Sequence, residues 1–374
     1  MPDGFMPFEQ WMHLALYAPG LGYYAAGNTK FGGDRPEGDF TTAPELTPLF
    51  GQALSKQVAE ILHASGSNQV LEFGAGSGAL AASIIPALQA LGITPHYQIL
   101  EVSAELRARQ QLALAPWGAS VTWLDALPDA FRGCVLANEV LDAMPATLFN
   151  WTDDATAVNE IGVVVVDDAN ADSPFAFAER AAARDVQDAV SRRMPPLAGY
   201  RSELNLQAEA WVREMGTWLV HGAALLIDYG FPQREYYHPQ RATGTLMCHF
   251  RHHAHSEPLI HAGLQDITTH VDFTAMADAA LAAGMDVLGY TSQARFLMNT
   301  GLPELLLQTL DHAAALASGT SPQDATIAAT RSLSGVQKLL SEAEMGELFK
   351  VLAIGRGIEP PLLGFARGDR RDRL

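Results

Sequence analysis

The sequence predicts an α/β protein with a mostly parallel, Rossmann-like sheet, on the basis of three observations. Short apolar runs alternate with helical patterns between residues 69 and 138, which is typical of a parallel sheet covered by helices. A glycine-rich turn, Gly74-Ala-Gly-Ser-Gly78, directly follows the first of these runs. A later run, Ala223–Tyr229, is almost wholly apolar, as expected of a central strand that is buried on both faces.

Composition and charge limit the class of protein. The chain has 374 residues, of which 48% are hydrophobic, so it can bury a sizeable core. Its formal net charge of −18 argues against nucleic acid or anionic lipid as a partner, because phosphates would be repelled. No apolar run reaches the roughly 18 residues that suggest membrane insertion. Cys134 and Cys248 form no CxxC pair and lie among apolar residues, which predicts core thiols.

The N-terminal region predicts both a location and a covering segment. Met1–Gln10 lacks the features of a secretory signal or a transit peptide, so we expect a cytoplasmic protein. An amphipathic stretch, Pro7–Tyr17, precedes a run rich in glycine, proline and aromatic residues. Such a segment is expected to lie over another part of the protein.

Further elements follow from the pattern of apolar residues. The expected strands of the sheet are Gln69–Phe73, His96–Glu101, Ser120–Leu124, Gly133–Asn138, Ala223–Tyr229 and Asp286–Tyr290. After Pro145 the sequence predicts paired strands, Thr147–Trp151 and Val158–Val166, and a helix, Ala181–Val190. Residues 293–341 are expected to be mainly helical, and Phe349–Ile354 and Pro361–Phe365 to be strands.

The glycine loop predicts a site for a nucleotide-like cofactor. Gly74, Gly76 and Gly78 permit positive φ angles and a close approach of ligand to backbone, while the helix that starts at Ala79 offers unpaired N–H groups. A plain tight turn and a dinucleotide site are the alternatives. The dinucleotide signature GxGxxG requires glycine at Ala79, although alanine is sometimes tolerated there.

Acidic residues after the strands favour S-adenosylmethionine. Glu72 would attract the amino group of this cofactor and repel a pyrophosphate. Glu101 is placed to accept hydrogen bonds from both ribose hydroxyls in either interpretation. Asp125, followed by Ala126, could accept the adenine amino hydrogen or serve as a turn residue.

Polar residues also follow the fourth and fifth expected strands. These are Asn138, Glu139 and Asp142 after one strand and Asp228 at the end of the other. Ligands of open α/β sheets bind at the carboxyl ends of the strands, so we expect this edge to carry the chemistry, with Asn138 on the cofactor. Ordinary loop positions are the alternative for Glu139 and Asp142.

The chain resembles the methyltransferase family that contains the MidA proteins and the mitochondrial complex I assembly methyltransferase. The matching segments run over most of the chain in the family's order: Pro19–Tyr24, Gly38–Glu45, the glycine loop, Asn138–Pro145, Asp228–Gly230, Gly244–Leu246, Asp266–Thr268, His270–Phe273 and Thr291–Gln293. The resemblance implies a class I methyltransferase with a seven-stranded sheet and a helical addition. For the best-known member it implies methylation of an arginine in a respiratory-complex subunit.

The resemblance also assigns cofactor residues. It implies cofactor roles for Gly74, Gly76 and Gly78. The segment Gly38–Glu45 is expected to close over the cofactor, which makes Phe40, Thr41 and Thr42 candidate contacts. Ala43 replaces the serine expected there, so a hydroxyl contact at that position is in doubt.

The expected organisation has four parts. Residues 1–50 would cover the cofactor site, and residues 51–292 would form the methyltransferase core, with an insertion at about 146–220. Residues 293–345 would be a helical addition, and residues 346–374 would supply the last strands and a tail.

An arginine substrate requires carboxylates, because its guanidinium has a pKa above 12 and can be held bidentately. The candidates for catalysis are Glu139, Asp228, Asp142, Glu203 and Asp272. Glu139 and Asp228 are the leading pair for gripping the substrate cation. The alternative is that some of these carboxylates cap helices or pair with Arg251 or Arg295.

The histidine-rich run Cys248-His-Phe-Arg-His-His-Ala-His255 invites a metal hypothesis, but its spacing matches no standard ligand pattern, so we expect no metal. Arg251, His252 and His253 are expected to line a substrate cleft, with solvated loop residues as the alternative. The helical stretch 293–341 could be a partner surface, but its alanine and leucine spacing is also that of a buried helix pair, which we favour; a homodimer is left open.

The sequence therefore predicts an S-adenosylmethionine-dependent methyltransferase, with a protein that presents an arginine as substrate and a role in assembling a respiratory or other protein complex. A non-catalytic assembly factor that binds the cofactor only for stability is the second hypothesis. An NAD-dependent dehydrogenase is the third.

Overall fold

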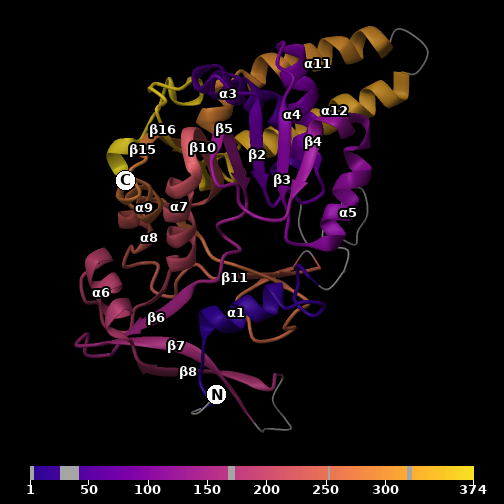
Figure 1. Cartoon of the computed structure of the whole chain (residues 1–374). Helices are drawn as coiled ribbons and strands as arrows, with labels where there is room; N and C mark the ends of the chain where they lie inside the picture. Colours follow the sequence, from indigo (N-terminus) through magenta and orange to yellow (C-terminus); the bar gives the residue numbers. More distant parts are fainter. Residues whose placement is uncertain (1–3, 26–41, 167–172, 252, 318–321) are drawn as a thin grey trace. The chain divides into compact units, whose positions relative to one another are not determined.

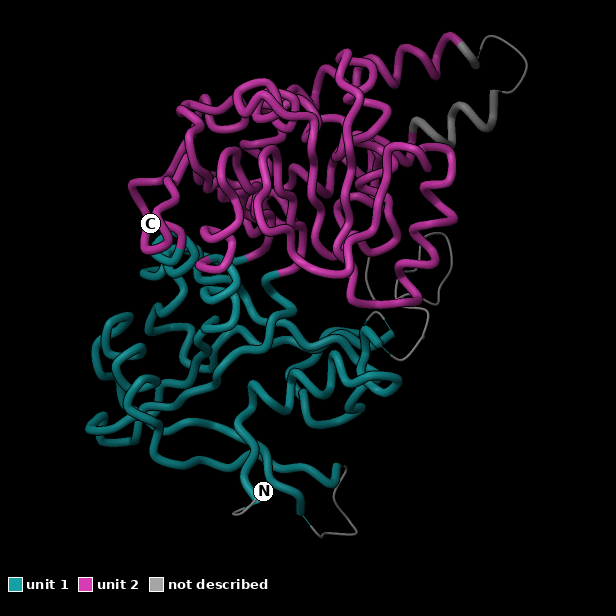
Figure 2. Tube along the Cα trace, in the orientation of Figure 1, with its two compact units in different colours: residues 1–40, 141–212, 230–279 teal, residues 41–140, 213–229, 280–374 magenta. Residues whose placement is uncertain are grey.

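The computed structural model describes residues 4–25, 42–166, 173–251, 253–317 and 322–374 (Figure 1). The chain divides into two compact units (Figure 2). Unit 1 comprises residues 1–40, 141–212 and 230–279, and unit 2 comprises residues 41–140, 213–229 and 280–374.

The sheet of unit 2 confirms the predicted class I α/β fold. Within the described residues its strands follow the order β15 (Asp286–Ser292), β16 (Phe349–Arg356), β10 (Leu219–Phe231), β5 (Phe131–Asn138), β2 (Gln69–Phe73), β3 (His96–Leu100) and β4 (Val121–Leu124). The pairs from β10 to β4 are parallel. Strand β16 runs antiparallel to both of its neighbours. The carboxyl ends of β2, β3, β5 and β10 therefore share one edge of the sheet.

Helices pack on this sheet because its strands are apolar on both faces. Residues from α3 (Leu49–Ser65) and α4 (Ala79–Ala90) form one core cluster with residues of β2 and β3. Trp218, the last residue of α7 (Leu206–Trp218), contacts Phe73 and Phe131, with ring centroids 6.1 and 6.2 Å away. The other helices with residues in unit 2 are α2 (Ala43–Leu46), α5 (Ala104–Ala113), α9 (Phe273–Ala282), α10 (Gln293–Asn299), α11 (Leu302–Ala317), α12 (Pro322–Leu340) and α13 (Met345–Leu348).

Unit 1 contains mainly antiparallel pairs. In one sheet β7 (Val158–Val165) pairs with β1 (Met6–Pro7), β6 (Thr147–Trp151) and β8 (Phe175–Ala181), and β6 pairs with β9 (Arg201–Leu204). A second sheet has the order β12 (His253–His255), β11 (Met247–Phe250) and β13 (Asp266–Thr268). The short strand β14 (Val271–Asp272) pairs in parallel with Gly230 and Phe231. The helices α1 (Phe8–Tyr17), α6 (Arg184–Arg193) and α8 (Gln233–Tyr236) also belong to this unit.

Most of the predicted strands are confirmed, including the antiparallel pair of β6 and β7. The expected strand at Pro361–Phe365 is wrong, because Leu363–Phe365 forms a 3₁₀ turn. The backbone N–H groups of Leu363 and Gly364 donate to Glu60 and Gln57 of α3, at 2.8 and 2.7 Å, instead of to a neighbouring strand.

The predicted helices are present, although the first of them begins later than expected. The helix expected from Ala181 starts at Arg184, since residues up to Ala181 belong to β8, a strand that was not predicted. The helical stretch after Gln293 is confirmed by α10, α11 and α12. Cys134 and Cys248 are buried free thiols, as expected. Among the described helices, none has the length and apolar character needed to cross a membrane.

Candidate cofactor and methyl-transfer site

The glycine loop at the end of β2 adopts a backbone that favours glycine. Gly74, Gly76 and Gly78 have φ angles of 60°, 55° and 83°, in the left-handed region that side chains rarely adopt. A Cβ atom at Gly74 would lie 3.3 Å from the Val140 side chain. Helix α4 begins directly after Gly78, so its first N–H groups face this loop. The loop therefore offers a partly exposed backbone, with Gly74 the exposed residue, and a helix N-terminus to a ligand.

Glu72 precedes the loop on β2 and is only 3% exposed. Its Oε2 accepts a hydrogen bond of 2.8 Å from the Tyr97 hydroxyl. Burial raises the pKa of this carboxyl to about 8; the hydrogen bond from Tyr97 lowers it, and the nearby Glu101 charge raises it further. Without a nearby cation, Glu72 is therefore mainly protonated at neutral pH.

Glu101 follows β3 and is held by two hydrogen bonds. Its Oε1 accepts from the Ser103 backbone N–H at 2.9 Å, and its Oε2 accepts from the Gln110 side-chain amide at 2.9 Å. The same amide also donates to the Gly76 carbonyl. Sequence reasoning missed Gln110, because a glutamine within a helical stretch carries no signal of a site.

Asp125 and Ala126, after β4, are both exposed. The Asp125 side chain is 85% exposed and forms an ion pair with Arg107 of α5. The proposed contact to adenine would have to compete with this pair.

The N-terminal segment of unit 2 meets the glycine loop. Thr42 caps α2 in a capping box with Glu45, and the Glu45 side chain hydrogen-bonds Ser77 within the loop. The backbone N–H of Ala43 donates to Glu139 Oε1 at 3.4 Å. Of the expected contacts in this segment, Phe40 and Thr41 lie outside the described residues.

Glu139 directly follows β5, and Asp228 lies near the carboxyl end of the neighbouring strand β10. Asn138 and Ile227 are partners in the register of these strands, and Glu139 and Asp228 are the next residues. Glu139 has a φ of 54°, its N–H donates to the Ile227 carbonyl at 2.9 Å, and its Oε1 accepts from Asn138 Nδ2 at 3.0 Å. A non-glycine residue in this conformation is strained, and such strain clusters at functional sites.

Asp228 is fully buried. Its Oδ1 accepts a hydrogen bond from the Tyr229 N–H at 2.9 Å. The register of β10 and β16 places Asp228 opposite Lys350, a lysine that is only 4% exposed. The pair Glu139 and Asp228 thus combines one accessible carboxylate with one buried carboxylate on the same sheet edge as the glycine loop.

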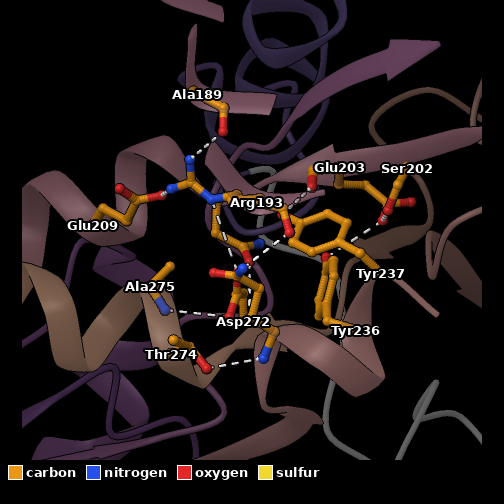
Figure 3. A network of polar contacts seen from close by, with 12 residues as sticks. Ala189, Arg193, Ser202, Glu203, Glu209, Tyr236, Tyr237, Asp272, Thr274 and Ala275 are labelled. Atoms are coloured by element: carbon orange, nitrogen blue, oxygen red, sulfur yellow. Dashed lines mark hydrogen bonds and ion pairs between the residues drawn. The ribbon is translucent and has the colours of Figure 1, made fainter. Parts of the chain in front are cut away.

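The other three acidic candidates, Asp142, Glu203 and Asp272, belong to unit 1. There the Glu203 carboxylate accepts hydrogen bonds from several surrounding groups (Figure 3). Its Oε1 accepts from the N–H groups of Thr245 and Leu246, at 2.9 and 3.1 Å. Its Oε2 accepts from the hydroxyls of Ser202, Thr245 and Tyr236, at 3.2 to 3.3 Å. A Cβ on Gly244 would lie 2.2 Å from Oε1, so the segment Gly244–Leu246 wraps closely around this carboxyl.

Asp272 lies in the same network (Figure 3). Its Oδ1 accepts from the Ala275 N–H at 3.2 Å at the start of α9, and its Oδ2 lies 3.9 Å from Arg193 Nε. Arg193 also pairs with Glu209. Burial raises the pKa of Asp272 to about 7, and the Arg193 charge opposes that rise.

The remaining candidates of unit 1 are Asp142, Arg251, His252 and His253. Asp142 is 5% exposed, and its carbonyl accepts from the Thr269 N–H at 3.0 Å. Arg251 and His253 are exposed, and the Arg251 guanidinium lies over the Phe250 ring. His252 lies outside the described residues. Among described residues, no group of three histidine, cysteine or acidic side chains could hold a metal ion.

Two substitutions of Glu203 separate a structural role of this residue from a catalytic role. Glu203→Leu should lower the free energy of unfolding by about 3 kcal/mol, because the buried N–H of Thr245 and the partly buried N–H of Leu246 lose their acceptor. Glu203→Gln, which keeps the shape and an acceptor oxygen, should retain turnover. Denaturant unfolding measures the free energy of unfolding and a methyl-transfer assay measures turnover. Glu235→Leu, at an exposed position, is the control. A stable Gln variant without turnover would instead make Glu203 catalytic.

Comparisons with known proteins agree with this geometry. Residues 53–291 match the model of a family described as "Putative S-adenosyl-L-methionine-dependent methyltransferase". A Burkholderia thailandensis crystal structure, described as a "likely methyl transferase" bound to S-adenosyl-homocysteine, is 49% identical. It superposes with a TM-score of 0.90 and covers 100% of this chain and 93% of that chain.

Curated relatives are more distant. A Drosophila melanogaster protein named protein arginine methyltransferase NDUFAF7 homolog, mitochondrial, is 28% identical over 98% of this chain and 86% of its own length. Its Mus musculus counterpart is 28% identical over 92% of this chain and 80% of its own length. The cytoplasmic location expected from Met1–Gln10 is contradicted by these relatives, whose names place them in mitochondria. The composition of an N-terminus is too weak a signal to decide a compartment.

The matched residues include the glycine loop, Glu101 and the ends of β5 and β10. The predicted fold class and cofactor are confirmed by the family match and by the related structure with S-adenosyl-homocysteine bound, which removes the dehydrogenase alternative. The chain therefore belongs to this family of S-adenosyl-L-methionine-dependent methyltransferases.

Proposed function

We propose that this enzyme is a protein arginine N-methyltransferase that acts in the assembly of a respiratory or other protein complex. The observation that carries the proposal is the pair of carboxylates on neighbouring strands: Glu139 directly follows β5, and Asp228 lies near the carboxyl end of β10. Relatives named protein arginine methyltransferases, aligned over most of the chain, support it.

The residues of unit 2 fit the cofactor. Bound S-adenosylmethionine supplies a methyl group on a sulfonium, which a nucleophile can displace in line. We assign the left-handed backbone of Gly74, Gly76 and Gly78 to the methionine part of the cofactor, Glu72 to its amino group and Glu101 to its ribose hydroxyls. The N–H groups at the start of α4 complete this surface.

Further cofactor contacts are assigned from position in the chain. Thr42 belongs to the segment that meets the loop through Glu45 and Ser77, and Asn138 ends the neighbouring strand β5. Asp125 and Ala126 directly follow β4 and are proposed contacts to the adenine of the cofactor. Phe40 and Thr41 are proposed from the family resemblance.

The substrate arginine needs orientation and charge stabilisation. A guanidinium is planar, and two carboxylate oxygens can hold two of its N–H groups and aim the third nitrogen at the methyl carbon. Glu139 is the better candidate for direct contact, because its side chain is partly exposed. Asp228 is buried and would stabilise the positive charge of the guanidinium electrostatically, without direct contact. The nitrogen loses a proton as it is methylated, and the Glu139 carboxylate is the acceptor we assign.

The acidic residues of unit 1 have supporting roles in this proposal. Glu203 and Asp272 organise the segments Gly244–Leu246 and α9 through the hydrogen bonds described above. Asp142 stays a candidate for the substrate cation. Arg251, His252 and His253 are proposed contacts to the protein substrate outside its arginine.

Mass spectrometry tests the proposed reaction. Proteins from cells that lack the gene, incubated with the enzyme and S-adenosylmethionine, should yield new methylarginine peptides. Glu139→Gln and Asp228→Asn should each lower turnover by about 100-fold, the scale of losing one electrostatic group at a reaction centre. Binding of S-adenosyl-homocysteine should stay within about threefold, since neither carboxylate is assigned to the cofactor.

Asp129→Asn, at an exposed position, is the matched control and should change neither turnover nor the binding of S-adenosyl-homocysteine. An active preparation that methylates no arginine would contradict the proposed substrate. Unchanged turnover of both carboxylate variants would remove Glu139 and Asp228 from the mechanism.

The raised pKa of Glu72 predicts a pH dependence of cofactor binding. The carboxyl is protonated below its pKa of about 8 and must ionise to pair with the cofactor's amino group. Affinity for S-adenosylmethionine should therefore rise by up to about tenfold per pH unit from pH 6 toward pH 8 and then level off. Calorimetry across this range should show this rise, and Glu72→Gln should bind more weakly and without it. A flat profile for the unmodified protein would contradict the assignment.

A further inference from the structure

Gln110 of α5 makes a bridge beneath the cofactor loop and is fully buried. Its Nε2 donates to the Gly76 carbonyl at 3.0 Å and to Glu101 Oε2 at 2.9 Å. Its Oε1 accepts from Trp123 Nε1 at 3.0 Å. Both N–H bonds and the carbonyl of this amide are thus engaged, and two of its three partners belong to the cofactor surface.

Trp123 fixes the orientation of the amide. The indole N–H can only donate, so the amide oxygen must face Trp123. The amide nitrogen is then directed at Gly76 and Glu101. A flipped amide would place two donors together at Trp123 and its oxygen against the Glu101 carboxylate.

The bridge fixes the plane of the Glu101 carboxylate. Ser103 holds one oxygen and Gln110 holds the other, so the group cannot rotate without breaking one of these hydrogen bonds. A carboxylate can accept about four hydrogen bonds, so these two constrain its direction and use only part of its acceptor capacity. The same amide holds the Gly76 peptide, which ties the loop to the carboxylate.

We infer that Gln110 is a positioning residue that gives the enzyme its selectivity for the ribose hydroxyls of the cofactor. It aims the Glu101 carboxylate and sets its position relative to the glycine loop. This inference rests on the assignment of Glu101 to the ribose hydroxyls made under the proposed function.

The amide can be removed with little change in volume. Gln110 Cγ would lie 3.6 Å from a Cβ on Gly78, so the side chain also packs under the loop. Gln110→Met keeps an unbranched side chain of similar size and removes all three hydrogen bonds. Gln111→Met makes the same change at an exposed position of the same helix and is the matched control.

Calorimetry with S-adenosyl-homocysteine and with its analogue lacking the ribose 2′-hydroxyl measures the selectivity. The unmodified protein and Gln111→Met should prefer the hydroxylated ligand by about tenfold or more, the factor of a hydrogen bond to a charged group. Gln110→Met should bind S-adenosyl-homocysteine about tenfold more weakly, and its preference should fall below about threefold.

Two outcomes contradict the inference and can be told apart. If Gln110→Met binds both ligands more weakly but keeps the full preference, Gln110 only supports the fold. If the unmodified protein shows no preference, the assignment of Glu101 to the ribose fails.

If Gln110→Met does not fold, Gln110→Glu replaces it in the experiment. Its carboxylate would repel Glu101 at pH 8, and protonation would restore one donor at lower pH. Its affinity relative to the unmodified protein should therefore recover as the pH falls. If Gln110→Glu and the unmodified protein bound S-adenosyl-homocysteine with equal affinity at every pH, the inference would be overturned.

Discussion

The parallel pairing of β2, β3, β5 and β10 is the constraint on which the site depends. Parallel strands end at the same edge of a sheet, so residues from four separate stretches of the chain converge there. The glycine loop, Glu101 and Glu139 each directly follow one of these strands, and Asp228 lies within β10, near its carboxyl end. Methyl transfer from a sulfonium requires alignment above all, and a buried parallel sheet provides a rigid frame for it.

The local conformations at this edge are costly, and the surrounding structure maintains them. Glu139 has a positive φ, which costs about 1–3 kcal/mol for a residue with a side chain. Hydrogen bonds to Ile227, Asn138 and Ala43 hold it in place. Glu72 is buried and mainly protonated without a ligand, so a bound cation would change its charge state. In the proposed site, the acidic residues would be stabilised by the positive charges of the cofactor and of the substrate arginine.

Much of the fold could be predicted from the sequence, because buried parallel strands are short apolar runs separated by helical patterns. Local signals also predicted the glycine loop, whose left-handed backbone is observed, and singled out the acidic residues near the strand ends as candidates. Gln110 could not be found, since its role depends on three partners from separate elements. The hydrogen-bonded environment of Glu203 could not be predicted, because its partners Thr245 and Leu246 are distant in sequence, and its catalytic role stays a prediction. Leu363–Phe365 was mistaken for a strand because its side-chain acceptors lie on α3.

A crystal structure of this enzyme with S-adenosyl-homocysteine tests the central assignment most directly. The ligand should lie at the carboxyl ends of β2 and β3, over the glycine loop. Both ribose hydroxyls should donate to Glu101 at about 2.7 Å, the usual distance for such a hydrogen bond. A ribose whose hydroxyls are bound elsewhere, with Glu101 still held by Ser103 and Gln110 but contacting no ligand, would contradict the account.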